Sequence, residues 1–154
     1  MHMKDITEKK FPEFLIRNLQ RKQRINKDFL IKSLSILKEI IDGLPSTIGI
    51  IFVSNRRIRK LNKEFLGRDC ETDVLSFSLS KDYGEIIISV EEAFKNAKRY
   101  SHTFDQELLY LIIHGLLHLK GYEDYNKEDY EKMKKIQDRI YRKVMRKIKN
   151  EKEK

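Results

Sequence analysis

The sequence has 154 residues, a mass of 18.5 kDa and a formal net charge of +9, with 37% of its residues charged and 40% hydrophobic. This length suits one ordinary domain, which argues against an enzyme with separate cofactor and substrate domains, and the hydrophobic content excludes wholesale disorder. The single cysteine, Cys70, cannot form an internal disulfide, and no apolar run reaches the roughly 18 residues of a membrane span. We therefore expect a cytoplasmic protein with no membrane partner.

The first half of the chain predicts alternating strands and helices. Residues 14–19 form a short segment, apolar apart from Arg17 and Asn18, and its pattern does not distinguish a strand from a helix. Asn26 is a helix N-cap ahead of an amphipathic stretch. Residues 47–53 are β-branched and apolar, which predicts a strand buried on both faces. Ser54 then caps a short helix that ends at Gly67.

The second half predicts a β-hairpin followed by three helices. Two strands are expected at 73–79 and 85–90, with turn-forming residues between them. Helices are expected at 91–100, at 104–119 and from about residue 126 onwards. The predicted fold class is α+β: a single domain over residues 1–154, with a small mixed sheet of about four strands, about five helices and a metal site at the end of a central apolar helix.

The positive charge is concentrated at the two ends of the chain. Residues 1–32 carry a net charge of +5 and residues 127–154 carry +6, whereas residues 33–126 carry −2. Such a distribution allows a polyanion to be held from the edges, with a basic tail from about residue 150. The alternative is that these charges only solvate helix faces. Charge alone makes a nucleic-acid partner plausible without establishing it.

The stretch HGLLHLKGYED, residues 114–124, carries the strongest chemical signal. His114 and His118 lie one helical turn apart, so their imidazoles face the same side of the helix and can share a metal ion. Gly121 ends the helix and turns the chain back, bringing Asp124, or less readily Glu123, within reach as a third ligand. Three protein ligands with one open position are typical of a catalytic zinc site.

Two other interpretations of this stretch remain open. The histidines could be hydrogen-bonded inside an apolar helix without any metal, although two polar rings gain little there without partners. A metallopeptidase is the second alternative, but such enzymes place a glutamate directly after the first histidine as general base, and here that position is Gly115. The open site in a basic protein suits phosphodiester cleavage better.

Three sequence blocks resemble the YbeY endoribonucleases, a bacterial family associated with ribosomal RNA maturation. The first block is HGLLHLKGY at residues 114–122, which is similar to the family signature HGxLHLxGY. The second block is Leu61-Asn62 followed by TDVLSF at residues 72–77, which is similar to the family's LN…TDVLSF segment. The third block is Gly84-Glu85-Ile86, which is similar to the family's GDI strand. The resemblance implies an α+β domain, a zinc ion held by three side chains and metal-dependent cleavage of single-stranded RNA. It assigns His114 and His118 as two of the ligands.

The chain departs from the family pattern at two functional positions. The third ligand of the family is usually histidine, whereas this chain has Asp124, whose negative charge would make a bound metal a weaker Lewis acid. The family also usually carries an arginine where this chain has Leu66. Arg68, two residues further on, is our candidate for the missing phosphate contact. The alternative is a solvated loop arginine.

Two further residues are weaker candidates. Asp73 could accept a hydrogen bond from a ligand histidine, although an aspartate at the start of a strand commonly caps a turn. Ser76 points to the opposite face from its two apolar neighbours and could line a substrate groove, or it could be a hydrogen-bonded strand serine.

The sequence thus predicts a zinc-dependent endoribonuclease that processes single-stranded ribosomal RNA, with the ribosome as a possible partner. The remaining alternatives are a non-catalytic metal-binding protein associated with RNA or the ribosome, and a metallopeptidase-like hydrolase. Nothing in the sequence predicts the oligomeric state.

Overall fold

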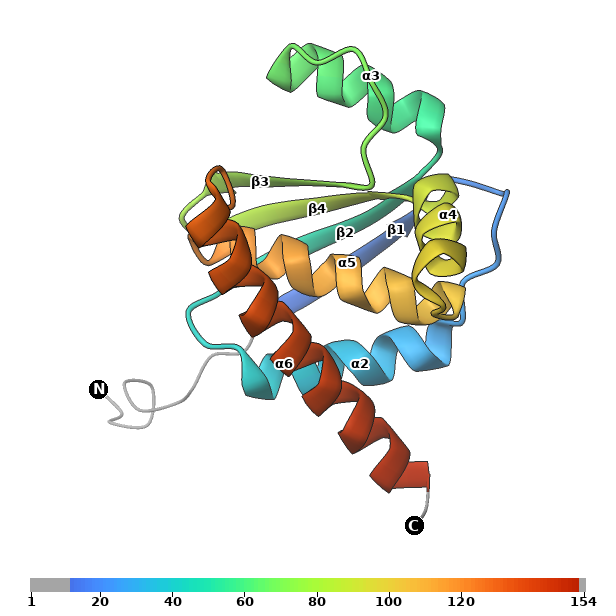
Figure 1. The fold of residues 1–154 in the computed structure, drawn as a ribbon, viewed down its shortest axis with the longest axis vertical. Helices are drawn as coiled ribbons and strands as arrows, with labels where there is room; N and C mark the ends of the chain where they lie inside the picture. Colours follow the sequence, from blue (N-terminus) through green and yellow to red (C-terminus); the bar gives the residue numbers. More distant parts are fainter. Residues whose placement is uncertain (1–11, 153–154) are drawn as a thin grey trace, which may run out of the picture.

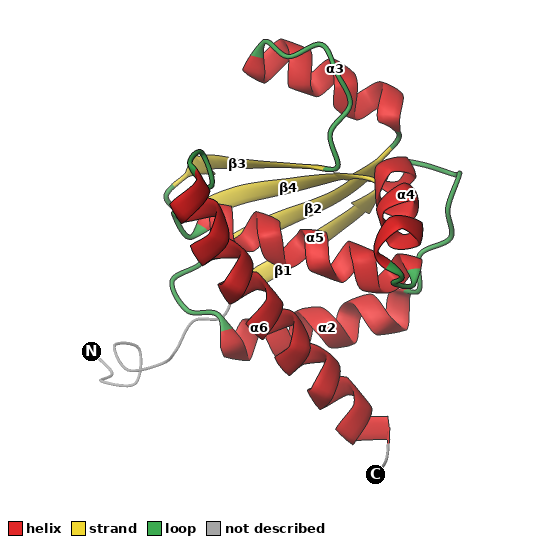
Figure 2. Cartoon of the chain, in the orientation of Figure 1, coloured by secondary structure: helices red, strands yellow, loops and turns green. Residues whose placement is uncertain are grey.

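A computed structural model describes residues 12–152 and contains one four-stranded mixed sheet (Figures 1 and 2). The strand order is β1-β2-β4-β3, in which β1, β2 and β4 are parallel and β3 is antiparallel to β4. The strands are β1 (Glu13–Asn18), β2 (Thr47–Val53), β3 (Val74–Ser80) and β4 (Tyr83–Ser89). The ambiguous first segment is therefore a strand, because it pairs along its whole length with β2.

Five helices surround this sheet in the described part of the chain, as predicted. They are α2 (Lys27–Ile40), α3 (Asn55–Leu66), α4 (Val90–Tyr100), α5 (Phe104–Leu119) and α6 (Lys127–Lys152). The predicted N-caps are present, since the side chain of Asn26 accepts from the amide of Phe29 and that of Ser54 accepts from Arg57. Helix α6 is still helical at the point where we expected a basic tail, and residues 153–154 lie outside the described part.

Strand β2 is buried on both faces, as its sequence predicted. Ile48, Ile50 and Phe52 belong to the main core beneath α2, α5 and α6. Ile51 and Val53 belong to a smaller apolar cluster with Ile58 of α3. The sheet therefore separates α3 from α5, which lie on opposite faces in Figure 1.

Helix α5 packs so closely on β4 that its backbone touches the sheet. A Cβ added at Gly115 would lie 2.7 Å from Cγ2 of Ile86 and 2.9 Å from its Cγ1. Both distances are below van der Waals contact, so this position has no room for a larger side chain. The general-base glutamate of the metallopeptidase pattern is excluded here by packing as well as by sequence.

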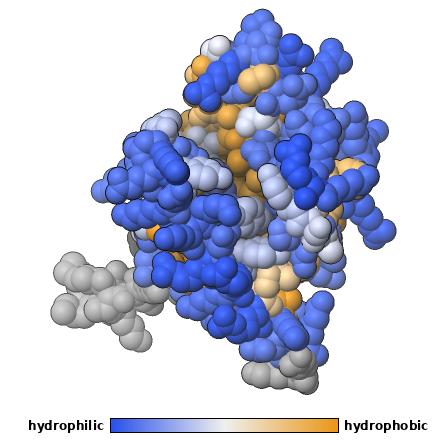
Figure 3. Space-filling model, viewed as in Figure 1, coloured by the Kyte–Doolittle hydropathy of each residue, from blue (hydrophilic) through white to orange (hydrophobic). Residues whose placement is uncertain are grey.

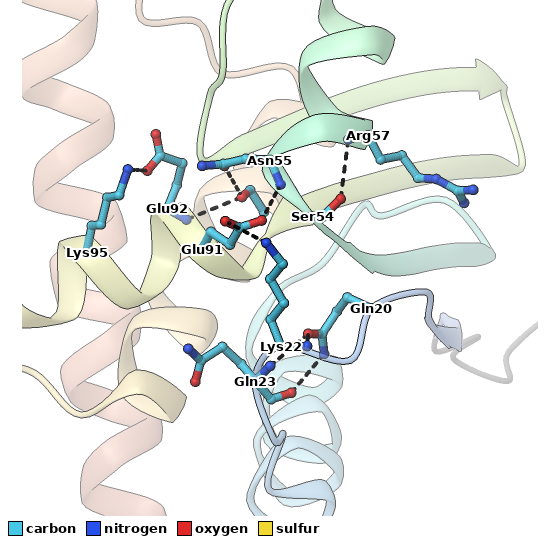
Figure 4. A network of polar contacts seen from close by, with 10 residues as sticks. Gln20, Lys22, Gln23, Ser54, Asn55, Arg57, Glu91, Glu92 and Lys95 are labelled. Atoms are coloured by element: carbon cyan, nitrogen blue, oxygen red, sulfur yellow. Dashed lines mark hydrogen bonds and ion pairs between the residues drawn. The ribbon is translucent and has the colours of Figure 1, made fainter.

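Polar contacts connect the start of α4 to the segment before α2 and to the first residue of α3 (Figure 4). Oε1 of Glu91 accepts from the backbone amide of Asn55 at 3.0 Å, and its Oε2 lies 3.4 Å from Nζ of Lys22. The buried hydroxyl of Ser89 donates to Oδ1 of Asn55 at 2.5 Å. The hydrogen bond from the backbone amide of Asn55 is the largest effect that lowers the pKa of Glu91. These contacts fix the start of α4 relative to β2 and α3.

The outer surface is mostly hydrophilic, with an apolar area between α3 and the rest of the molecule (Figure 3). Among the large apolar side chains at the surface of the molecule, Phe65 is 62% exposed and Leu79 is 56% exposed. Among residues 12–152, every helix is too short or too polar to cross a membrane.

Candidate metal centre

The predicted ligands converge where α5 turns into α6. His114 and His118 lie on consecutive turns of α5, with ring centroids 4.6 Å apart. Gly121 has a φ of +109°, which an L side chain rarely adopts, and the amide of Tyr122 donates to the carbonyl of Leu117 at 3.0 Å. This turn brings Asp124 back toward the two histidines, as its spacing predicted.

Three ligand atoms face one another in this cluster. Nε2 of His114 lies 3.0 Å from Nε2 of His118. Oδ2 of Asp124 lies 3.6 Å from the first nitrogen and 3.5 Å from the second. Within the described residues, this is the only group of three histidine, cysteine or acidic side chains close enough to share a metal ion.

The other ring nitrogens determine which tautomer each histidine adopts. Nε2 of Gln137 donates to the carbonyl of Tyr110 at 3.1 Å, so its amide oxygen is the atom that faces Nδ1 of His114, also at 3.1 Å. Nδ1 of His118 lies 2.9 Å from the carbonyl oxygen of Tyr122. Both partners only accept hydrogen bonds, so both Nδ1 atoms carry the hydrogen when the rings are neutral.

The two Nε2 lone pairs therefore point at each other and at a carboxylate, with no hydrogen between them. Burial lowers the pKa of His114, so this ring favours its neutral form. Three converging lone pairs repel one another unless a cation lies between them. Two imidazole nitrogens and one carboxylate oxygen are a donor set that suits zinc, so the residues present fit a metal ion.

A cavity of about 730 Å³ extends from this cluster between α4, α5, α6 and the start of β3. His114 and Asp124 lie in its wall. Three basic side chains also line it: Arg99, Lys134 and Arg142. A polyanion entering the cavity would meet these positive charges in the wall that also holds His114 and Asp124.

The structure places the weaker sequence candidates in different environments. Asp73 lines the cavity, and its Oδ2 accepts from Nδ2 of Asn96 at 3.1 Å; its role as a support for a ligand histidine stays a prediction. The hydroxyl of Ser76 donates to the carbonyl of Gly115 at 3.3 Å, which links β3 to α5 between the two histidines. Its contact with substrate stays a prediction.

Arg68 does not line the cavity. It is exposed on the loop after α3, where its backbone amide donates to the carbonyl of Asn62 at 3.2 Å. The same buried asparagine donates to the carbonyl of Cys70 at 3.0 Å and so shapes this loop. Its catalytic role stays a prediction, whereas Arg99, Lys134 and Arg142 line the cavity that contains two of the predicted ligands.

Sequence reasoning missed two buried polar residues near the ligands. Gln137 is 4% exposed, and the signal for it was a glutamine among the apolar core positions of an amphipathic helix. Glu107 is 2% exposed and lies seven residues before His114, on the same side of α5. Burial, together with the charge of Asp73, raises the pKa of Glu107 to about 7.

Comparison with known proteins gives one consistent family. A family model described as "Endoribonuclease YbeY" matches residues 13–145. The Endoribonuclease YbeY of Phytoplasma mali is 37% identical over 131 residues, covering 82% of this chain and 86% of that protein. The protein of the same name from Thermotoga neapolitana is 45% identical over 114 residues, covering 67% and 75%.

One solved structure has a similar sequence and fold. The solution structure of a Thermotoga maritima protein superimposes with a TM-score of 0.57 at 32% sequence identity, covering 88% of this chain and 93% of that one.

Proposed function

The chain belongs to the YbeY endoribonuclease family, and we propose that it is a zinc-dependent endoribonuclease that cuts single-stranded RNA during ribosomal RNA maturation in the cytoplasm. The observation that carries the proposal is the convergence of two imidazole lone pairs and a carboxylate at distances of 3.0 to 3.6 Å. A metal-dependent nuclease needs such an incomplete ligand set, because one coordination position must stay open for the reaction.

The side chains of this chain have separable roles in that reaction. His114, His118 and Asp124 would hold the metal, and Gln137 and the carbonyl of Tyr122 orient the two imidazoles. A bound zinc ion would supply a Lewis acid and an activated water for phosphodiester hydrolysis.

The basic side chains in the cavity wall would receive the RNA backbone. Arg99 comes from α4, and Lys134 and Arg142 come from α6. They can neutralise charge that builds up on the phosphoryl oxygens, as cations commonly do in such sites. Because this attraction is electrostatic, we expect RNA affinity to fall steeply with salt.

Cleavage of a fluorescent single-stranded RNA by variants purified in parallel tests the proposal. Asp124→Ala should lose cleavage, whereas its exposed neighbour Glu123→Ala removes the same charge beside the cluster and should retain it. His118→Ala should also lose cleavage, as should wild type in excess chelator. Equal cleavage by all preparations would indicate a contaminating nuclease and would contradict the proposal. Zinc binding without any cleavage would favour the non-catalytic RNA-binding alternative.

A further inference from the structure

Aromatic rings surround the part of the cavity that lies away from the metal cluster. The rings of His102 and Tyr110 are stacked, with centroids 6.3 Å apart and an interplanar angle of 23°. Tyr141 of α6 meets both edge-on, at 5.7 Å and 5.6 Å. The hydroxyl of Tyr110 donates to Oδ1 of Asp138 at 2.6 Å, which holds its ring in place. All three rings line the cavity, and RNA-binding proteins use such rings to stack unpaired bases.

The polar groups beside these rings are mainly acceptors. Asp73, Asn96 and Glu107 line the same part of the cavity, from the start of β3, from α4 and from α5. Asn96 donates to Asp73 at 3.1 Å. Oε1 of Glu107 is buried and has no hydrogen-bond partner among the described residues. Asn96 also bonds to the carboxyl group of Glu107, which leaves Oε1 as the oxygen that can still accept from an N–H donor entering the cavity.

The aromatic end of the cavity lies at a distance from the metal cluster that one nucleotide can span. Glu107 precedes His114 by seven residues, which corresponds to about 10 Å along the helix axis. Both residues line one continuous cavity, and Arg99 and Arg142 lie in its wall. A phosphate at the metal cluster would therefore leave the adjoining base near the rings and carboxylates.

We propose that the pocket formed by Asp73, Asn96, His102, Glu107, Tyr110 and Tyr141 binds a guanine base next to the phosphate that is cut. This inference rests on the proposed function, because it places the base relative to a phosphate at the metal cluster. Guanine presents two adjacent donors, N1–H and the N2 amino group, and one ionised carboxylate can accept from both. Adenine and cytosine present one amino group, and uracil presents one N–H, so each leaves an acceptor unpaired.

Nucleotide binding tests this pocket without depending on catalysis. Calorimetric titration of the full chain at pH 8.5, above the raised pKa of Glu107, with GMP, inosine monophosphate and AMP compares ligands that share a phosphate and ribose. We expect GMP to bind at least about tenfold more tightly than inosine monophosphate, which lacks only the N2 amino group. In Glu107→Gln this difference should disappear, whereas Tyr125→Ala, an 84% exposed tyrosine outside the cavity, should keep it.

The outcomes separate this inference from the proposed function. Equal affinity for the three nucleotides, or a GMP preference that survives in Glu107→Gln, would overturn the guanine pocket even if RNA is cleaved. A GMP preference lost in Glu107→Gln would support the pocket even if no RNA is cleaved, and only the proposed function would then fail. If Glu107→Gln does not fold, two other variants test the pocket. Asp73→Asn should reduce the preference for GMP over the other nucleotides, and Tyr141→Leu should weaken the binding of all three nucleotides because it removes a stacking ring.

Discussion

Replacing Glu107 with glutamine should change how the stability of the fold depends on pH. The carboxyl group is 2% exposed, and burial is the largest cause that raises its pKa from 4.5 to about 7, with the charge of Asp73 second. Glutamine has nearly the same shape and cannot ionise, so the variant removes the titration while preserving the packing.

The sign and size of the effect follow from proton linkage. Between pH 4.5 and pH 7 the folded state binds the proton more tightly than the unfolded state, so the free energy of unfolding falls as the pH rises. The destabilisation caused by burying the charged carboxylate is absent at pH values below the unfolded-state pKa and is complete at pH values above the folded-state pKa. A difference of two to three pKa units corresponds to about 3 kcal/mol, at about 1.4 kcal/mol per unit.

Urea denaturation at pH 5 and pH 8.5 measures this term. The unfolding free energy of wild type should fall relative to Glu107→Gln by about 2.5 kcal/mol between the two values, because pH 5 already lies above the unfolded pKa. Any constant cost of the buried amide cancels in this comparison. Glu131→Gln, an exposed glutamate on α6, controls for the loss of one negative charge. Parallel pH curves for wild type and Glu107→Gln would refute the assignment of a raised pKa to this buried group.

Three further predictions concern the helix that carries the ligands. Gly115→Ala gains about 1 kcal/mol of helix propensity but forces a Cβ to 2.7 Å from Cγ2 of Ile86, and such overpacking costs about 1–3 kcal/mol. We therefore expect the variant to have a lower Tm than wild type. A Tm equal to or above that of wild type would contradict this packing. Gln137→Leu removes the acceptor that orients His114, so zinc affinity measured by chelator competition should fall about 10- to 100-fold, and unchanged affinity would show that the amide does not support the ligand. Zinc at 100 times its Kd should stabilise the wild-type fold by about 2.7 kcal/mol in a thermal melt, and a zinc-independent Tm would argue against a metal centre in this cluster.

Patterns within a few residues were sufficient for most elements and for the ligand cluster. The caps Asn26 and Ser54 were predicted because a capping side chain bonds to an amide three residues away. His114, His118 and Asp124 were predicted in the same way, since helix periodicity and one glycine turn bring them together. The first strand stayed ambiguous, because its strand conformation depends on pairing with β2, more than 30 residues later.

Tertiary packing decided the surroundings of those ligands. The packing of α6 against α5 brings Gln137 to His114, 23 residues away in sequence, and encloses the cavity. The approach of β3 places Asp73 near Glu107, which raises the pKa of that carboxyl group. Arg68, chosen because it lies two residues after the position where the family usually carries an arginine, lies outside the cavity wall. Local spacing determines which side chains share a turn, whereas contacts between distant segments form only when the buried faces of whole elements pack together.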